Sequence, residues 1–195
     1  FVSSASHELK TPIAIIRGYA EGLKMNMSEG DESSSQYCDI IMNEADKMNE
    51  LVLNMLEQSL YSTGNKLPEK AEFGLKEYVE EFLKPAEPIF KEKGITIKTE
   101  VADAAVYGDK KQLTTVLSNI VLNACSHAKD EKRIEIFTEE EEGFLKVNVF
   151  NTGSFVDDKD KDGIFTSFYR ADKAHSRAEG RFGLGLSIVK SITEN

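Results

Sequence analysis

The fold of this chain is decided first by residues 9–27, which read LKTPIAIIRGYAEGLKMNM. Apolar side chains recur here in steps of four and three, at Leu9, Ile13, Ile16, Ala20, Leu23 and Met27. This spacing places them along one stripe of a helix, as in a coiled coil. After the polar stretch 28–35 the spacing returns at Tyr37, Ile41, Ala45, Met48, Val52, Met55 and Ser59. The sequence therefore predicts an antiparallel helical hairpin with a short polar turn.

An isolated helical hairpin cannot bury the apolar stripe of both its helices. Pairing with a second copy would bury the stripe in a dimeric four-helix bundle, which is the arrangement we expect. The alternative is that the hairpin packs against the C-terminal half of its own chain. The spacing of the apolar residues leaves both arrangements open.

Beyond residue 60 the pattern changes to a mixture of helices and strands. A polar segment rich in Ser, Gly, Asn and Pro predicts a linker at 61–72. Asp109 can cap the second of the later helices, and Pro85 and Pro88 should bend or interrupt the first. Helical patterns cover 73–93, 110–128 and 184–193, and strand patterns cover 95–101, 133–138 and 144–150. We therefore expect a helical domain at 1–66 and a two-layer α/β sandwich with mainly antiparallel strands at 67–195.

Composition and charge limit the binding partners and the cellular compartment that the sequence predicts. The formal net charge of −10 argues against binding to nucleic acid or to an anionic membrane surface. Cys38 and Cys125 have no metal-binding or redox spacing, which favours a reducing, cytoplasmic compartment. No apolar run reaches the ~20 residues of a membrane span, and the chain begins in a helical pattern without Met. We expect the cytoplasmic portion of a longer protein, whose upstream part would carry any membrane anchor.

The first candidate catalytic residues lie in the segment Ser6-His7-Glu8-Leu9-Lys10-Thr11-Pro12. Helical spacing places His7 and Thr11 on one face, one turn apart, with Glu8 beside the histidine. An imidazole attacks phosphorus well when a carboxylate accepts the proton of its other nitrogen, which Glu8 can do. Thr11 can hydrogen-bond a water molecule or a phosphoryl group near His7. A single exposed histidine is usually without function, so His7 alone would not identify the chemistry.

A second group lies late in the helix predicted at 110–128. Asn119 and Asn123 are one turn apart, so both amides share a face. Two neutral oxygen donors beside nucleotide phosphates suit Mg²⁺, which keeps several waters and needs few protein ligands. By itself the pair is a weak signal, because two asparagines can equally face solvent.

Three segments of the C-terminal half have residue types that suit a nucleotide. Asn151-Thr152-Gly153 ends a predicted strand and enters a loop, although such a segment can also be a simple turn. Arg170 and Arg177 can stabilise a phosphoryl group in transfer, with a solvated charge as the alternative for each.

The last of these segments is glycine-rich. Gly180, Gly183 and Gly185 precede a helix, where backbone N–H groups and the helix dipole favour phosphate. The glycines do not follow a strand in a βαβ unit, which disfavours a dinucleotide-binding fold.

Together these segments resemble the sensor histidine kinase family. Residues 7–12 are similar to its phosphoacceptor motif, 119–124 to the N box, 149–153 to the G1 box, 165–170 to the F box and 180–186 to the G2 box. The five motifs occur in the family's order, so the resemblance covers nearly the whole chain.

The resemblance implies that ATP, with Mg²⁺ held by Asn119 and Asn123, phosphorylates His7 while Glu8 orients the imidazole and accepts its proton. The phosphoryl group would pass to an aspartate in the receiver domain of a response regulator, and Thr11 would help the reverse, phosphatase reaction. The family likeness also implies a homodimer and a bacterial, membrane-anchored sensor. The ATP-contacting residues that it implies are Asn119, Asn123, His127, Lys129, Asn151, Gly153, Arg170, Arg177, Gly180, Gly183, Gly185 and Leu186.

The chain departs from the family pattern at two positions. Ser126 stands where a basic residue is frequent, so Lys129 is the expected substitute contact. Asn151 stands where the family has Asp, which accepts a hydrogen bond from the adenine amino group. An uncharged acceptor predicts weaker nucleotide affinity. The family's ATP-binding domain also continues past the last helix to a closing strand, so we expect an exposed sheet edge here.

Two other classes of function stay open from the sequence. The ATP-binding motifs are shared with chaperone and DNA-repair ATPases, which would hydrolyse ATP without needing His7. The replacements at Ser126 and Asn151 also allow a non-catalytic scaffold that does not bind ATP with Mg²⁺. The signal sensed and the cognate regulator lie outside these residues.

Overall fold

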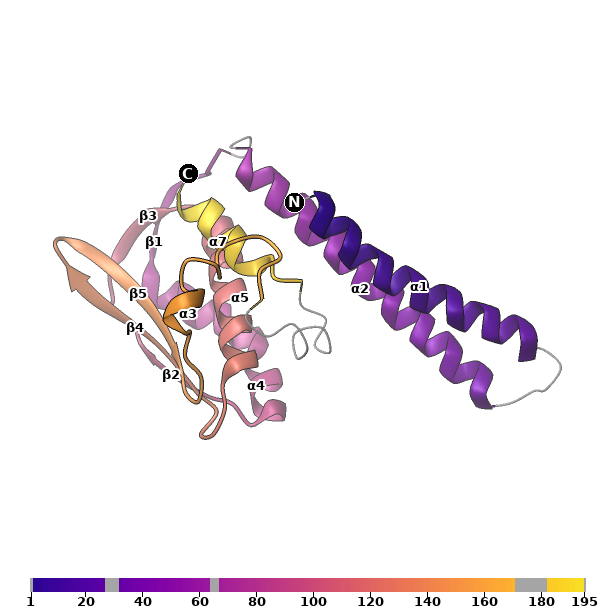
Figure 1. Cartoon of the computed structure of the whole chain (residues 1–195). Coiled ribbons are helices and arrows are strands. Elements are labelled where there is room, and N and C mark those ends of the chain that lie inside the picture. The colour runs from indigo at the N-terminus through magenta and orange to yellow at the C-terminus, as the bar shows by residue number, and fades with distance from the viewer. Residues whose placement is uncertain (1, 27–31, 64–66, 171–181, 195) are drawn as a thin grey trace.

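A computed structural model describes residues 2–26, 32–63, 67–170 and 182–194. Two long helices, α1 (Val2–Asn26) and α2 (Glu32–Ser62), run antiparallel and project away from the rest of the molecule (Figure 1). The helix α1 continues through Pro12. The predicted helical hairpin is therefore confirmed.

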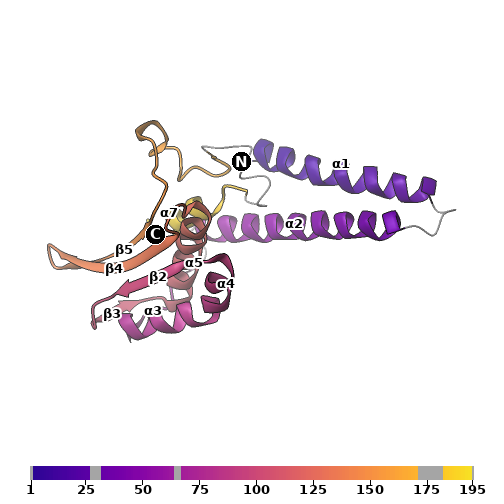
Figure 2. The ribbon, with the colours of Figure 1, turned by 90° about the horizontal axis from the view of Figure 1, so that it is seen from below.

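The rest of the chain is a two-layer α/β sandwich, as predicted. Its main sheet has the order β2 (Thr96–Glu100), β4 (Arg133–Glu141), β5 (Phe144–Asn151), with β4 parallel to β2 and antiparallel to β5. Among the described strands β5 pairs with β4 alone, so its outer edge is unpaired. A small antiparallel sheet joins β1 (Ala71–Gly74) to β3 (Ala105–Gly108). The helical layer comprises α3 (Leu75–Leu83), α4 (Glu87–Lys93), α5 (Lys110–His127) and α7 (Gly185–Thr193) (Figure 2).

The prediction of one bent helix at 73–93 was wrong in its first residues. Residues 71–74 form β1 because they pair with residues 105–108, a contact between distant segments that no local pattern indicates. The two prolines interrupt the helix as expected. Pro85 lies in a short 3-10 helix, Lys84–Ala86, and Pro88 lies in the first turn of α4.

Apolar contacts between the main sheet and its helices form the core of the sandwich. Ile134 and Ile136 of β4 have no exposed surface, and they share a cluster with Leu117 and Val121 of α5. The two isoleucines are two residues apart, so they point to the same face of the strand. Each fully buried aliphatic side chain contributes about 1.5–3 kcal/mol relative to exposure.

A second apolar cluster joins the hairpin to the sandwich. Leu51 and Tyr61 of α2 and Leu184 and Ile188 beside or within α7 are at most 3% exposed. The buried Gln58 of α2 lies at the same contact, where it is hydrogen-bonded to α7. This end of the hairpin therefore packs against the C-terminal half of its own chain, one of the two arrangements that the sequence left open.

Several apolar side chains along the hairpin remain exposed. Within the predicted stripe Ile13 is 49% exposed and Val52 43%. Met42, Leu53 and Leu56 on α2 are between 56% and 63% exposed. Contact with the same chain therefore covers one end of the hairpin and leaves apolar surface along much of its length.

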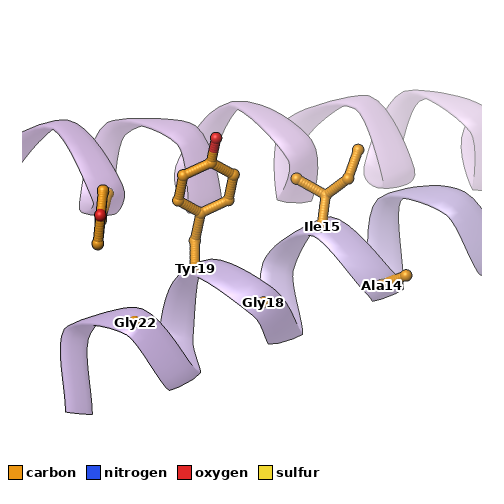
Figure 3. A pocket seen from close by; sticks show the side chains of 6 residues that line it. Ala14, Ile15, Gly18, Tyr19 and Gly22 are labelled. Carbon is orange, nitrogen blue, oxygen red and sulfur yellow. The ribbon is translucent and has the colours of Figure 1, made fainter. Parts of the chain in front are cut away.

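A shallow hollow of about 250 Å³ lies between the two hairpin helices, against Gly18 and Gly22. Tyr19 points from α1 toward the neighbouring helix (Figure 3), and its ring meets that of Tyr37 edge to face at 5.2 Å between centroids. The hollow is lined by Ala14, Ile15, Gly18, Tyr19, Gly22 and Tyr37. This lining has no cationic or carboxylate group, so the hollow does not suit a nucleotide.

The helix α5 begins with the predicted Asp109 cap. The carboxylate of Asp109 accepts hydrogen bonds from the backbone N–H groups of Lys111 and Gln112, at 2.8 and 3.1 Å, and of Glu69, at 2.7 Å. Burial alone would raise the pKa of Asp109, but these hydrogen bonds outweigh it and lower the pKa.

We predict that Asp109→Ala lowers the free energy of unfolding by about 1 kcal/mol at pH 7, because two N-terminal amides of α5 lose their acceptor. Asp109→Asn should cost less, since its carbonyl oxygen can still cap. Because the pKa is lower in the folded state, the charge stabilises the protein above the unfolded pKa of about 3.9. The advantage of the parent over the Asp109→Asn variant should therefore vanish as the pH falls through the folded pKa.

Urea denaturation at pH 7 and over a descending series of pH values below the unfolded pKa of about 3.9 measures both effects. Equal stability of the parent and Asp109→Ala at pH 7 would contradict the assigned cap.

Candidate functional site

His7 lies in the first turns of α1 with its side chain exposed. Thr11, one turn later, is also exposed, whereas Ala5 and Pro12 are buried. The helix therefore faces the protein with its small and apolar residues and presents the imidazole and the hydroxyl outward. Both groups are accessible to a phosphoryl donor or to water.

Glu8 faces the C-terminal half of the chain. Its Oε2 accepts a hydrogen bond from Nη2 of Arg170 at 2.9 Å, across 162 positions of sequence. The side chains are 18% and 6% exposed, so water screens this ion pair far less than it screens a surface pair. The structure thus places a cation of the F box directly beside the phosphoacceptor motif.

The F box and the G2 box meet around Arg170. The backbone N–H of Phe168 donates to the carbonyl of Gly183 at 2.8 Å. Gly183 has a φ of +70°, and a Cβ there would lie 2.6 Å from the carbonyl oxygen of Tyr169. A side chain at Gly183 would therefore push the F box away, which explains the glycine.

Tyr169 anchors the same segment from the other side. Its hydroxyl donates to Oδ1 of Asp160 at 2.6 Å, and this hydrogen bond is the main cause that raises the pKa of Tyr169. A Cβ on Gly163 would come within 2.8 Å of the Tyr169 ring. The ring therefore packs directly on the glycine backbone and fixes the segment that leads to Arg170.

The N box meets the start of α7 at Asn119. Asn119 Nδ2 donates to the carbonyl of Thr115 at 2.9 Å, which leaves Oδ1 directed toward Gly185. A Cβ on Gly185 would lie 2.6 Å from that oxygen. The amide oxygen of the N box thus lies at the N-terminus of α7, where phosphate oxygens are favoured.

The end of α5 and the G1 box form a further contact. Thr152 and Lys129 are hydrogen-bonded through Lys129 N to Thr152 O, at 3.0 Å, and Thr152 Oγ1 to Lys129 O, at 3.2 Å. Gly153 has a φ of +79°, and a Cβ there would lie 2.6 Å from the Lys129 carbonyl oxygen. The exposed Lys129 side chain is thereby held beside the G1 box.

Asn151 is half-buried at the end of β5. Its Nδ2 donates to Ser154 Oγ at 2.9 Å and, more weakly, to the Thr152 carbonyl at 3.4 Å. These contacts occupy the amide nitrogen and leave the carbonyl oxygen as the group that can accept a hydrogen bond from a base.

The remaining predicted residues are placed as follows. Asn123 is half-buried one turn after Asn119, and His127 is exposed at the last residue of α5. Leu186 is half-buried in the first turn of α7. Arg177 and Gly180 lie outside the described residues.

Sequence reasoning missed the residues that connect the two domains. Gln58 Nε2 donates to Ser191 Oγ at 3.1 Å, and Ser187 Oγ donates to Gln58 Oε1 at 3.2 Å. Gln58 and Ser187 are 7% and 4% exposed. The available signal was a polar residue between apolar positions of a helix, which by itself indicates a solvent-facing residue.

Comparison with known proteins agrees with this geometry. The family model described as "His Kinase A (phospho-acceptor) domain" matches residues 1–63. The model "Histidine kinase-, DNA gyrase B-, and HSP90-like ATPase" matches residues 108–195. Sensor-like histidine kinase SenX3 of Mycobacterium tuberculosis is 29% identical over all of this chain and 48% of the relative. The chain thus spans about half the length of that relative.

Solved structures show the same likeness. The catalytic domain of histidine kinase ThkA is 31% identical, with a TM-score of 0.56 over 65% of this chain and 80% of that one. Histidine kinase ThkA in complex with response regulator protein TrrA gives a TM-score of 0.72 at 28% identity, over 87% of this chain and 50% of that one. This chain belongs to the sensor histidine kinase family, with a phosphoacceptor domain and an ATP-binding domain.

No helix in the described part of the chain is both long enough and apolar enough to cross a membrane. Nor do the described His, Cys, Asp and Glu side chains form a group of three that could hold a metal ion.

We predict that Gly185→Ala weakens ATP binding at least about tenfold, because the new methyl group displaces the Asn119 amide from the start of α7. Titration with a fluorescent ATP analogue measures the change. Gly18→Ala is the matched control, since a Cβ at Gly18 meets nothing within 4 Å. Unchanged affinity in Gly185→Ala would show that Asn119 does not need its described position.

Proposed function

We propose that this chain is the autophosphorylating core of a bacterial sensor kinase. It transfers the γ-phosphoryl group of ATP to His7 and then to an aspartate in the receiver domain of a response regulator. The observation that supports this best is the contact between Glu8 and Arg170, which puts the nucleotide-binding half against the phosphoacceptor helix. We assign residues 1–66 to dimerisation and phosphotransfer, and residues 67–195 to ATP binding.

The roles of the reacting residues follow from their chemistry. A bond forms between a His7 nitrogen and the γ-phosphorus while the bond from that phosphorus to the β-phosphate oxygen breaks. Glu8, next to His7, accepts the imidazole proton. Arg170, once it no longer pairs with Glu8, supplies positive charge to the phosphoryl oxygens.

The residues at the nucleotide site fit Mg²⁺. The carbonyl oxygen of Asn119 lies against Gly185 at the start of α7, and Asn123 lies one turn further along α5. Neutral amide oxygens suit this ion, which takes most of its remaining ligands from phosphates and water. When bound, Mg²⁺ would neutralise charge on the phosphates, and Asn119 and Asn123 are the residues that would hold it.

The other proposed contacts to ATP are assigned from the family motifs. The carbonyl oxygen of Asn151 accepts from the adenine amino group, with weaker affinity than a carboxylate would give. Gly153, Gly183 and Gly185 allow close backbone approach, with Leu186 beside them. His127, the last residue of α5, and Lys129, just beyond it, are further proposed contacts to ATP. Arg177 and Gly180 complete this set by family likeness.

The chain acts as a homodimer with the receiver domain as its second partner. The exposed apolar residues Ile13, Val52 and Leu53 are a surface that a second hairpin would bury in a four-helix bundle. The structural relative ThkA is described in complex with a response regulator, which supports a receiver domain as partner. We propose that the chain is the cytoplasmic portion of a membrane-anchored sensor; relatives named as sensor histidine kinases support a sensor.

The direct test incubates the chain with Mg²⁺ and γ-labelled ATP, beside the variant His7→Gln. We expect acid-labile, base-stable label on the parent and none on the variant, because a phosphorus–nitrogen bond is cleaved by acid. ATP binding without label, with equal ATP hydrolysis in both proteins, would instead indicate a simple ATPase. Failure to bind ATP with Mg²⁺ at millimolar concentration would indicate a scaffold.

We further propose that Thr11 positions the water that dephosphorylates the regulator, because its exposed hydroxyl lies one turn from His7. Thr11→Ala should slow dephosphorylation of the phosphorylated receiver by about tenfold while His7 labelling keeps its rate. Thr11→Ser, which retains the hydroxyl, should keep most of the phosphatase activity. Equal loss of both activities in Thr11→Ala would refute this role and indicate damage to the helix.

A further inference from the structure

The ion pair between Glu8 and Arg170 engages two groups that the proposed reaction needs elsewhere. Glu8 is the carboxylate beside His7, and Arg170 is the described cation of the F box. The Nη2 group of Arg170 donates to Glu8 at 2.9 Å, so in this arrangement that donor is not on a phosphate. A carboxylate and a phosphate that share one guanidinium repel each other and each gains less from its positive charge, so the two compete.

The surroundings of Arg170 make this competition strong. Its side chain is 6% exposed, and its Nε is buried without a hydrogen-bond partner in the described part of the chain. Of the carboxylates described, Glu8 is the one in ion-pair contact with it. If Glu8 lost its charge, a buried guanidinium would stay uncompensated, which is strongly unfavourable. The pair therefore stabilises the contact between the domains only while both charges are present.

Other contacts between the two domains hold Glu8 and Arg170 beside each other, and these contacts involve neither of the two side chains. Leu9, next to Glu8, packs on the cluster that contains Ile188, and Phe168, two residues before Arg170, packs on it too. Gln58 adds two hydrogen bonds to α7. The apolar cluster thus aligns Glu8 with Arg170 and closes water out of the ion pair.

We propose that the Glu8–Arg170 pair is an autoinhibitory contact, and that the phosphates of ATP compete with Glu8 for Arg170. Binding of the nucleotide then releases the carboxylate beside His7 and the arginine in one step. This rests on the proposed function, since ATP must bind beside Arg170. It goes beyond that function because it makes Glu8, a residue of the other domain, a determinant of nucleotide affinity.

The proposal has a consequence that can be measured without phosphoryl transfer. If Arg170 is available to phosphate in only a fraction of molecules, the apparent dissociation constant for ATP is raised by the inverse of that fraction. Removing the charge of Glu8 releases Arg170 and should tighten ATP binding. In a chain that lacks the Arg170 charge, removing Glu8 should have no further effect.

The experiment is isothermal titration of ATP with Mg²⁺ into the parent, Glu8→Gln, Arg170→Gln and the double variant. We expect Glu8→Gln to bind ATP about three- to tenfold more tightly than the parent, and Arg170→Gln to bind it more weakly. The double variant should match Arg170→Gln. Glu21→Gln is the control, because it removes an exposed carboxylate of the same helix that pairs with Arg17; its affinity should equal that of the parent.

Equal or weaker binding in Glu8→Gln, with ATP bound normally by the parent, would overturn the inference while the proposed function stands. Equal tightening by Glu8→Gln and Glu21→Gln would also overturn it, because the effect would then be one of net charge. Absence of ATP binding in the parent would instead defeat the proposed function itself.

Discussion

The contact between α2 and α7 determines how the two domains lie relative to each other. Leu51 and Ile188 have no exposed surface there, and Gln58 is hydrogen-bonded to two serines of α7. Burying an amide or hydroxyl group without a hydrogen-bond partner is unfavourable. These hydrogen bonds therefore fix the position of α2 along α7 and also stabilise the contact. With α2 and α7 aligned, the start of α1 comes beside the F box. The ion pair between Glu8 and Arg170 depends on this alignment.

The nucleotide site is organised by contacts that need a glycine. Gly153 lies against Lys129, Gly183 against the F box and Gly185 against Asn119. In each case a Cβ would come within 2.6 Å of an oxygen atom. The contacts of Gly183 and Gly185 hold one box of the family against another, and the contact of Gly153 holds the G1 box against the residue that follows the C-cap of α5. Asn119 and Gly185 are 66 positions apart in the sequence. Such distant motifs can form one site because a glycine, which has no Cβ, lets the two segments approach closely.

Much of this could be predicted from the sequence, for physical reasons that differ between elements. The hairpin follows from long helical periodicity, and the start of α5 follows from the Asp109 cap, because both depend on neighbouring residues. The strands β1 and β3 were missed because each has four residues and exists through pairing with the other. Gln58 and the pair of Glu8 with Arg170 could not be predicted, since their partners lie more than 120 positions away.

The hairpin sequence allowed two arrangements, packing on the same chain and pairing with a second copy, and the structure is compatible with both. One end of α2 packs on its own chain, while Met42 and Leu56 remain 63% and 57% exposed along the helix. Packing within the chain and the proposed pairing with a second copy would therefore use different parts of the hairpin. Release of the domain contact at one end would leave the proposed bundle intact along the rest.

The central claim is that the phosphates of ATP displace Glu8 from Arg170 and thereby loosen the domain contact that this ion pair stabilises. The reactivity of a thiol buried between α2 and α7 tests it most directly. Ser187 is 4% exposed and nearly isosteric with cysteine, so Ser187→Cys can be made with Cys38→Ser and Cys125→Ser. Lys190→Cys, exposed on the same helix, is the control. The account predicts slow maleimide labelling at position 187 without nucleotide and about tenfold faster labelling with a non-hydrolysable ATP analogue and Mg²⁺. A rate at position 187 that stays slow when the analogue is bound would contradict it.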